Sequence, residues 1–257
     1  MYASAKVALA MLVIALLAAC GRDAPPAPPD QHPPQQPPNP VDPVAIVDAL
    51  PADASAEQLH EALNTLLPAI YRTPSGDFSP VFDALGRLRD QPRVVEALMQ
   101  RYESLPTTEY QQRIFTIQVL GELRRPDAAA ALRAITWSPL PPKASTGELL
   151  SPRDFEEMIR VQAVRGIAYL RTEAADREVT AVMLKHESKT VQVAAIDAYL
   201  WNHEGDPEAA DRLRKILPRE LHPFVDAVRV HGGMDPQSFN EQISTWRKKW
   251  GTTEVTR

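Results

Sequence analysis

The sequence predicts an all-α protein built as a stack of helical hairpins, and internal repeats are the main reason. Val161–Leu170 reads VQAVRGIAYL, and Val191–Leu200, which starts 30 residues later, reads VQVAAIDAYL. Shorter copies of the tail of this segment occur at Val119–Leu123 (VLGEL) and Ala84–Leu88 (ALGRL). Repetition with a period of this size is typical of stacked helical pairs. Val, Ile and Thr seldom stand in alternating runs, which argues against a β-rich fold.

Residues 1–19 have the pattern of a secretory signal peptide. A short segment with one positive charge, Lys6, precedes an apolar run from Val7 to Leu17. This order of a charged and an apolar region is typical of exported proteins. About a dozen residues are too few to cross a ~30 Å hydrocarbon layer as a helix, so we do not interpret the run as a membrane span.

The apolar run ends in four residues that resemble the lipobox of bacterial lipoproteins: Leu17, Ala18, Ala19 and Cys20. The resemblance implies transfer of diacylglycerol to the Cys20 thiol, cleavage before Cys20, and acylation of the new amino group. Cys20 is the only cysteine of the chain, so no intramolecular disulfide can form. The alternative is an ordinary signal peptide in which Cys20 has no role.

A lipidated chain of this kind is expected in the cell envelope, attached to the lipid bilayer through Cys20. Each buried methylene contributes about 0.8 kcal/mol, so two or three acyl chains hold a protein firmly. Gly21 and Arg22 follow the cysteine instead of Asp. In lipoproteins of enterobacterial type, this resemblance implies the outer membrane, with the domain facing the periplasm.

Residues 20–43 are expected to form a disordered, Pro-rich tether. Ala24–Pro43 contains ten prolines in twenty residues. Proline fixes φ and has no amide hydrogen, so the segment favours polyproline II over helix or sheet. At ~3.1 Å per residue its reach is on the order of 60 Å. The alternative functions are a ligand for a proline-binding module and a thread through the cell-wall mesh.

Residues 44–257 are predicted to form one helical domain. An early helix starts at Ser55, where Gln58 is placed for a capping box, and Pro68 is expected to end or kink that helix. The following helices pair off. Their expected ranges are 80–89 with 92–102, 108–124 with 126–137, 152–171 with 174–186, 190–202 with 207–217, and a closing pair at 223–230 and 236–250.

Many of these helices are expected to begin at a proline. Four of the prolines follow a residue whose side chain can cap a helix, and the preceding residues are Ser79, Ser151, Asp206 and Asp235. A capping side chain followed by Pro at the first helical position is a favoured helix start. The high proline content is therefore compatible with a helical fold.

The repeats resemble HEAT-like repeats in their short-period bacterial form. Val191–Leu200 matches the family pattern of Val-Arg, a small-residue stripe and an Ala-Leu tail, although Gln162 and Gln192 replace the Arg, which is present as Arg113. The resemblance extends roughly over residues 79–217. It implies an α-α superhelix, or solenoid, that binds proteins on a concave surface. Tetratricopeptide-like pairs are an alternative of the same general form.

Two places are candidates for partner binding. An insertion at Ser138–Ser151 interrupts the array, and such insertions often gather on the binding side. Trp137 precedes the insertion, and Leu140 and Lys143 lie in it. The second candidate is Trp201, near the end of its predicted helix. For each Trp the alternative is a ring packed over a helix terminus.

Composition and motifs argue against nucleic-acid binding and known catalytic centres. A formal net charge of −5 gives no general attraction to nucleic acid. The sequence has no HExxH, GxSxG or GxxxxGK(S/T) motif and no paired-cysteine site, so we predict no catalytic residue, metal or cofactor. His-Glu dipeptides start at His60, His186 and His203. They resemble those of deoxyhypusine hydroxylase, a di-iron enzyme built from HEAT repeats, but stand in unrelated registers.

The sequence therefore predicts a lipid-anchored envelope protein whose helical repeats bind an unidentified envelope protein or peptide. One alternative is an accessory or assembly subunit of an envelope complex. The other is a metal-dependent HEAT-repeat enzyme, which would require metal in the purified protein.

Overall fold

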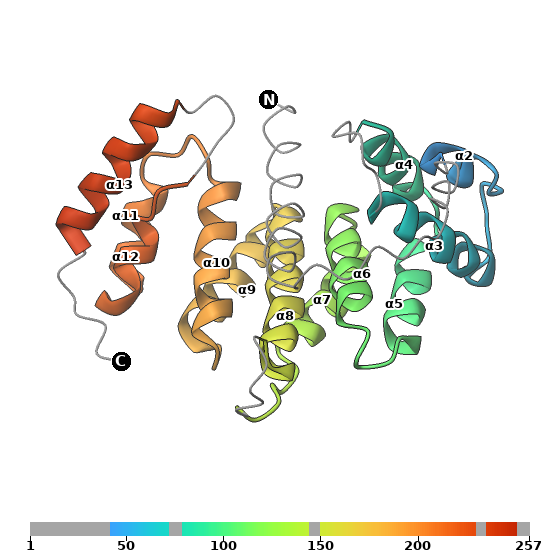
Figure 1. The fold of residues 1–257 in the computed structure, drawn as a ribbon, viewed down its shortest axis with the longest axis horizontal. Helices are drawn as coiled ribbons and strands as arrows, with labels where there is room; N and C mark the ends of the chain where they lie inside the picture. Colours follow the sequence, from blue (N-terminus) through green and yellow to red (C-terminus); the bar gives the residue numbers. More distant parts are fainter. Residues whose placement is uncertain (1–41, 72–78, 144–149, 230–234, 251–257) are drawn as a thin grey trace, which may run out of the picture.

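The structure is a computed structural model that describes residues 42–71, 79–143, 150–229 and 235–250. The secondary structure in these ranges is helical and contains no strand (Figure 1), which confirms the predicted all-α class. The residues predicted to form the signal peptide, the lipobox and the Pro-rich tether, up to residue 41, lie outside these ranges. The helices are α2 (Pro43–Asp48), α3 (Ala56–Tyr71), α4 (Ser79–Arg89), α5 (Val94–Ser104), α6 (Tyr110–Glu122), α7 (Ala129–Thr136), α8 (Pro152–Tyr169), α9 (Glu173–Lys185), α10 (Lys189–Asn202), α11 (Ala209–Ile216), α12 (His222–Val225) and α13 (Pro236–Trp250), with short 3-10 turns η1 (Pro126–Ala128) and η2 (Arg219–Leu221).

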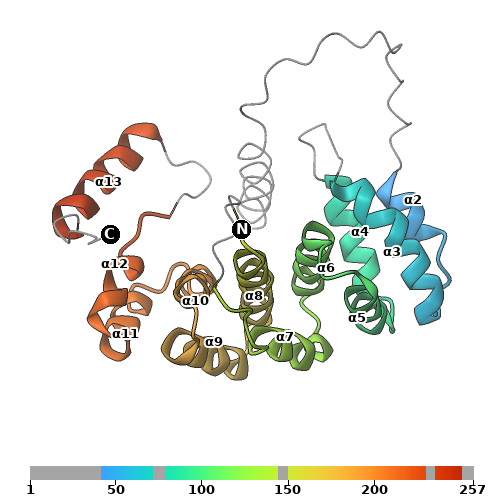
Figure 2. The same ribbon diagram turned by 60° about the horizontal axis from the view of Figure 1, so that its bottom comes forward.

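Most helices pack against helices that are near them in the sequence. α6, α8 and α10 lie side by side, α7 packs behind α8, and α9 packs behind both α8 and α10 (Figures 1 and 2). At the two ends, α2 packs on α4, α3 packs on α5, and α12 packs on α10. Figure 2 shows α6, α8 and α10 on the concave side of a curved row of helices. These three helices are called the inner layer below.

Two helices begin at capping boxes, of which the one at Ser55 was predicted as a box and the one at Ser151 only as a capping side chain followed by Pro. At the start of α3, the Gln58 amide donates to Ser55 Oγ at 3.2 Å, and the Ser55 amide donates to Gln58 Oε1 at 2.9 Å. At α8, Ser151 caps the helix and the carboxylate of Asp154 accepts the Ser151 amide at 2.7 Å. This backbone hydrogen bond is the main cause of the lowered pKa of Asp154. Reciprocal bonds of this kind satisfy amide groups that a helix start leaves without partners.

Pro68 does not end α3, because the helix continues beyond it to Tyr71. The missing amide of a proline removes one hydrogen bond, to the carbonyl four residues earlier. Near a helix end this loss is confined to the final turns. Packing of the apolar face, which includes the buried Leu66 and Leu67, keeps the chain helical.

The closing pair differs from the prediction, because α12 ends at Val225 instead of Val230. The Arg229 guanidinium donates to the carbonyls of Phe224 at 2.8 Å and Val225 at 3.1 Å. A longer helix would use these carbonyls for its own backbone bonds. The arginine side chain therefore takes the place of the next helical turn.

α11 also starts later than expected, at Ala209. Asp206 Oδ1 accepts the Glu208 amide at 2.9 Å and forms a turn that includes Pro207. The Ala209 amide donates to the Asp206 carbonyl, three residues back, at 3.2 Å, so this first turn is closed by a shorter-range bond than that of an α-helix. The helix begins once this turn is complete.

α6 and α8 approach closely where two glycines meet. A Cβ added to Gly121 would stand 2.7 Å from Cα of Gly166, and one added to Gly166 would stand 2.8 Å from Cα of Gly121. Optimal contacts between carbon atoms are about 3.5–4.0 Å, so neither position has room for a side chain. Leu132 of α7, which is fully buried, fills the space behind Gly166.

Two arginines join the end of α4 to the end of α6. Arg89 Nε donates to the Leu123 carbonyl at 2.8 Å, and Arg125 Nη1 donates to the carbonyls of Arg89 and Gln91 at 3.0 Å each. The last carbonyls of a helix lack backbone partners and carry partial negative charge. Each arginine therefore caps the helix of the other.

α6 and α8 end in the same way. Arg124 and Arg171, the second residue after each helix, both have φ of +53°. Left-handed residues at this position close the last turn of a helix, and Gly is their usual type. The shared conformation places the Leu-Arg pairs 123–124 and 170–171 at equivalent points of the two inner helices.

The glycine contact gives a prediction about stability. Gly121→Ala and Gly166→Ala should each lower the free energy of unfolding by about 1–3 kcal/mol, because the new methyl meets backbone that cannot move aside. Gly86→Ala is the matched control, since a Cβ there meets nothing within 4 Å. We expect Gly86→Ala to stabilise the protein by about 0.5–1 kcal/mol through helix propensity. Urea unfolding of the three variants measures these changes, and equal effects at all three positions would contradict the close approach.

Candidate partner-binding site

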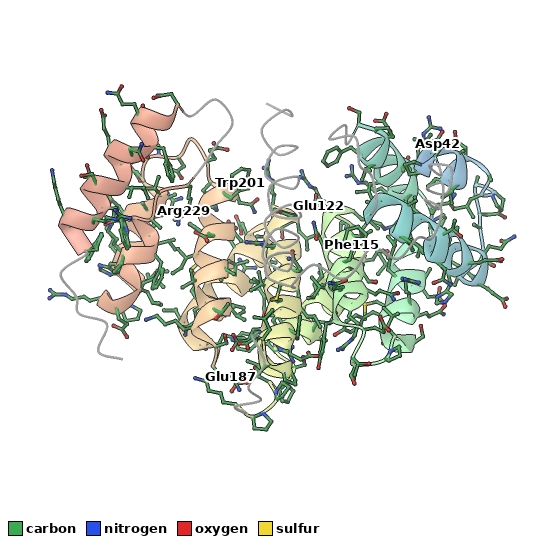
Figure 3. The ribbon with its side chains drawn as sticks, viewed as in Figure 1. Asp42, Phe115, Glu122, Glu187, Trp201 and Arg229 are labelled. Carbon is green, nitrogen blue, oxygen red and sulfur yellow. The ribbon has the colours of Figure 1, made fainter. Side chains whose placement is uncertain are left out.

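The structure separates the predicted binding residues into two groups at opposite ends of the inner layer. Leu140 donates its amide to Glu187 Oε1 at 3.2 Å, which places the segment of Trp137, Leu140 and Lys143 where α10 begins (Figure 3). Trp201 lies in the last turn of α10 (Figure 3). At 1.5 Å per residue, the helix puts roughly 20 Å between these places. The four side chains therefore do not form one site.

Trp137 follows the last residue of α7 and is partly packed against α9. Its Nε1 donates to Glu178 Oε1 at 2.6 Å, and its ring centroid lies 5.7 Å from that of His186. The side chain is 38% exposed all the same. Trp137 thus combines a fixed orientation with an accessible apolar surface, which suits a contact residue.

The first residues of the insertion are held by arginines of α8. Arg160 is 2% exposed and donates to the Ser138 carbonyl at 3.1 Å and to the Pro139 carbonyl at 2.9 Å. Arg153 Nη1 donates to the Pro141 carbonyl at 2.7 Å. Residues 138–141 are therefore fixed to α8 through their backbone. Leu140 is half-buried and Lys143 is exposed, so of these two Lys143 is the more accessible.

Glu156 balances the charge of Arg160 and joins it to α6. Its Oε2 accepts from Arg160 Nη1 at 2.6 Å, and its Oε1 accepts from Arg113 Nη1 at 2.6 Å. Burial opposes ionisation of this carboxyl, but the hydrogen bonds from both arginines outweigh it and hold the pKa of Glu156 below its ordinary value. Because one carboxylate serves two guanidinium groups, we call the three residues the Glu156 network.

The Glu156 network extends to α5 through Tyr102. Arg113 Nη2 donates to the Tyr102 hydroxyl at 2.9 Å, and the guanidinium carbon lies 4.7 Å from the centre of the ring. Burial raises the pKa of Tyr102, so the hydroxyl stays protonated. Arg113, the arginine of the repeat pattern, therefore joins α6 to α5 and α8. The contacts of the Glu156 network hold helices together.

The inner layer carries several half-buried apolar side chains, and Trp201, in the last turn of α10, is one of them. Tyr110 of α6 stacks on Phe155 of α8 with ring centroids 4.3 Å apart and an interplanar angle of 7°. Further residues of the layer are partly exposed and rest on the buried core: Phe115 of α6, Met158 and Val161 of α8, and Leu200 of α10. Half-exposed apolar side chains of this kind supply contact area to a partner.

The sequence did not predict a cluster of polar residues at the carboxyl ends of α6 and α8, which consists of Glu122, Arg124 and Tyr169. Burial raises the pKa of Glu122 above its ordinary value, and the charges of Arg124 and Arg89 oppose this only in part. Burial also raises the pKa of Tyr169, with a contribution from the Glu122 charge, and Arg124 lies 5.4 Å from the Tyr169 ring. Glu122 lies seven residues from Phe115 and so on the same face of α6 (Figure 3). A Leu-Arg pair ends three of the four repeat tails, at 88–89, 123–124 and 170–171, and is the sequence signal for this region.

The three His-Glu dipeptides lie on separate parts of the fold. His186 is 6% exposed; its Nδ1 accepts the Ser188 amide at 3.0 Å, so Nε2 carries the proton and donates to the Thr136 carbonyl at 3.0 Å. His203 Nε2 lies 3.1 Å from Asp176 Oδ2. His60 is in α3. Within the described ranges, no three metal-binding side chains come together.

Comparisons with known proteins gave no match. No family model matches the sequence, no curated protein matches it, and no solved structure matches it. Among the helices between residues 42 and 250 that the structure describes, none has the length and apolar content needed to cross a bilayer.

The Glu156 network predicts a pH-dependent stability. A carboxyl whose pKa is lower in the folded state adds stability above its unfolded pKa and loses it as the pH falls through the folded pKa. Glu156→Gln should therefore reduce the free energy of unfolding by about 2–3 kcal/mol at pH 7 and by much less at about pH 3. Urea unfolding at both pH values measures the difference.

The control for this experiment is Glu173→Gln, because the Glu173 side chain is 95% exposed in its pair with Arg177. Exposed pairs contribute little, so we expect a change of less than about 0.5 kcal/mol at either pH. A Glu156→Gln deficit that is the same at pH 3 and pH 7 would show that the carboxylate charge is not what stabilises the network.

Proposed function

We propose that this chain is a lipid-anchored envelope protein whose helices act as a protein-binding scaffold of the HEAT-like repeat type. The packing of helices on their neighbours in the sequence supports this proposal, since arrays of repeats are built in that way. The equivalent ends of α6 and α8, with Arg124 and Arg171 in the same conformation, also support it.

The observation that carries the proposal is the inner layer. α8 and α10 bury one side against α7 and α9, and α6 packs on α5 and α8. In Figure 2, none of the described helices covers the concave side of this layer. That side offers half-exposed apolar residues, such as Met158 and Val161, next to the polar residues Glu122 and Arg165. Interfaces of protein complexes combine an apolar centre with a polar rim in the same manner.

The anchor is proposed from Leu17, Ala18, Ala19 and Cys20, which match the lipobox at each position. Diacylglycerol on the thiol and a further acyl chain, such as palmitate, on the amine would hold the chain in the outer membrane on its periplasmic side. The Pro-rich segment would then separate the helical domain from the lipid headgroups. The domain would meet its partner within tether length of the membrane.

The anchor is tested by Cys20→Ala in the native host. We expect the wild-type chain to incorporate radioactive palmitate and to sediment with membranes until detergent is added. Cys20→Ala removes the only thiol, so it should incorporate no palmitate. Equal labelling of both chains would contradict the proposed lipidation.

The binding surface is tested by photo-crosslinking in cells. A photoreactive amino acid at Met158 or Val193 of the inner layer should form the same partner adduct, and one at Ala130, which is exposed on α7, should not. Met158→Glu should reduce that adduct from Val193 at least about tenfold, because it places a charge in an apolar contact. Ala130→Glu is the control and should leave it unchanged. Adducts at Ala130 alone would place binding on the other layer.

A further inference from the structure

Glu122 differs from the other half-buried carboxylates of the described ranges. Each of the others accepts a hydrogen bond, and these residues are Asp154, Glu156, Glu157, Asp176, Glu178, Asp197, Asp206 and Asp226. The carboxylate of Glu122 accepts none and forms no ion pair with a residue that the structure describes. A carboxylate that is partly removed from water and has no hydrogen-bond donor is costly, so a donor from a ligand would stabilise it.

Two half-buried arginines beside Glu122 also lack hydrogen bonds. The other buried or half-buried arginines of the described ranges each donate at least one, and they are Arg101, Arg113, Arg125, Arg153, Arg160, Arg212, Arg214 and Arg229. Arg124 and Arg165 donate none to a described residue. Arg124 lies over the Tyr169 ring, and the charges of both arginines oppose the rise in the pKa of Tyr169. Both guanidinium groups are therefore near this one tyrosine.

These groups lie at one end of the inner layer. Glu122 is the last residue of α6, and Figure 3 shows it at the same end of the layer as Trp201. Arg165 comes four residues after Val161 and seven after Met158, so these three residues share one face of α8. The Glu122 cluster is the name used below for Glu122, Arg124, Arg165 and Tyr169.

The charges of the Glu122 cluster indicate the chemistry of its ligand. Two guanidinium groups and one carboxylate leave an excess of positive charge, which favours an anion, and guanidinium groups bind carboxylates through paired N–H donors. The Glu122 carboxylate can only accept, so it favours an N–H group of the same ligand. The carboxyl terminus of a peptide carries both groups on one Cα atom. An acidic side chain holds its carboxylate on flexible methylenes, away from the backbone N–H.

We propose that Arg124 and Arg165 bind the terminal carboxylate of a partner peptide, and that Glu122 accepts the amide N–H of its last residue. The proposal rests on the proposed function, because it names the ligand of the same inner layer. The peptide runs from the Glu122 cluster over Val161 and Met158 towards the other end of the layer. Met158 lies roughly 10 Å along α8 from Arg165, a distance that an extended peptide covers in about three residues.

The first test locates the terminus of the partner by photo-crosslinking in cells. The adduct from a photoreactive amino acid at Met158 should map, by mass spectrometry, to about the last six residues of the partner. An adduct that maps to the interior of the partner's chain would overturn this inference and leave the scaffold function standing. No adduct at Met158 or Val193 would overturn both.

The second test measures binding of the full chain to a synthetic peptide of about the last ten residues of the crosslinked partner. Fluorescence anisotropy should show at least about tenfold weaker binding when the terminal carboxylate of the peptide is replaced by an amide. Arg165→Gln should weaken binding of the free-acid peptide by a similar factor and should reduce its preference over the amide.

The matched control is Arg177→Gln, because the Arg177 side chain is 72% exposed on α9. It should leave binding of both peptides unchanged. Equal binding of the acid and the amide by the wild type would overturn the proposal. A loss of binding only when an acidic side chain of the peptide is replaced would also overturn it, in favour of a side-chain carboxylate.

Unfolding in urea separates a binding role from a structural one. Arg165→Gln should leave the midpoint unchanged, since Arg165 donates no hydrogen bond to a described residue. Burial raises the pKa of Glu122, so its charged form is disfavoured in the folded chain, and Glu122→Gln should raise the midpoint at pH 7. Arg113→Gln loses bonds to Glu156 and Tyr102 and should lower it. A fall for Arg165→Gln as large as that for Arg113→Gln would overturn the binding role of Arg165.

Discussion

The close contact between Gly121 and Gly166 is the constraint on which the centre of the structure depends. With no side chain between them, the backbones of α6 and α8 approach closely enough for Leu132 to close the core from behind. The same spacing lets Glu156 of α8 reach Arg113 of α6 at 2.6 Å while it also holds Arg160. A wider spacing would open the core and break the ion pairs together. The two glycines at the centre of the contact and the ion pairs at its margin thus require the same distance between α6 and α8.

The sequence predicted the helices well because helix starts and apolar faces are local properties. The capping box at Ser55 involves residues three positions apart, and the cap at Ser151 directly precedes Pro152, so both helix starts were visible without a structure. The early end of α12 was not, because it depends on Arg229, which also bonds Asp197, 32 residues away. Contacts between residues far apart in the sequence decide where a helix of this kind ends, and helix propensity alone does not predict those contacts.

The candidate site was predicted only in part, for the same reason. Trp137 and Trp201 stood out as residue types, but their positions at opposite ends of α10 follow from the direction of each helix in the array. Arg160 gave no signal, because a charged residue in a helix is ordinarily exposed, whereas here it is buried and satisfied by backbone carbonyls. The lipid anchor depends on the four lipobox residues and stays a prediction from sequence.

Packing between neighbours in the sequence has a mechanical consequence. A chain pulled from its amino end would lose α2 and α3 first, since these helices pack chiefly on each other and on α4 and α5. The caps formed by Arg89 and Arg125 would carry the load next, and the glycine contact between α6 and α8 would follow. Force would therefore dismantle the molecule in steps, and the inner helices around α8 would outlast the amino-terminal ones.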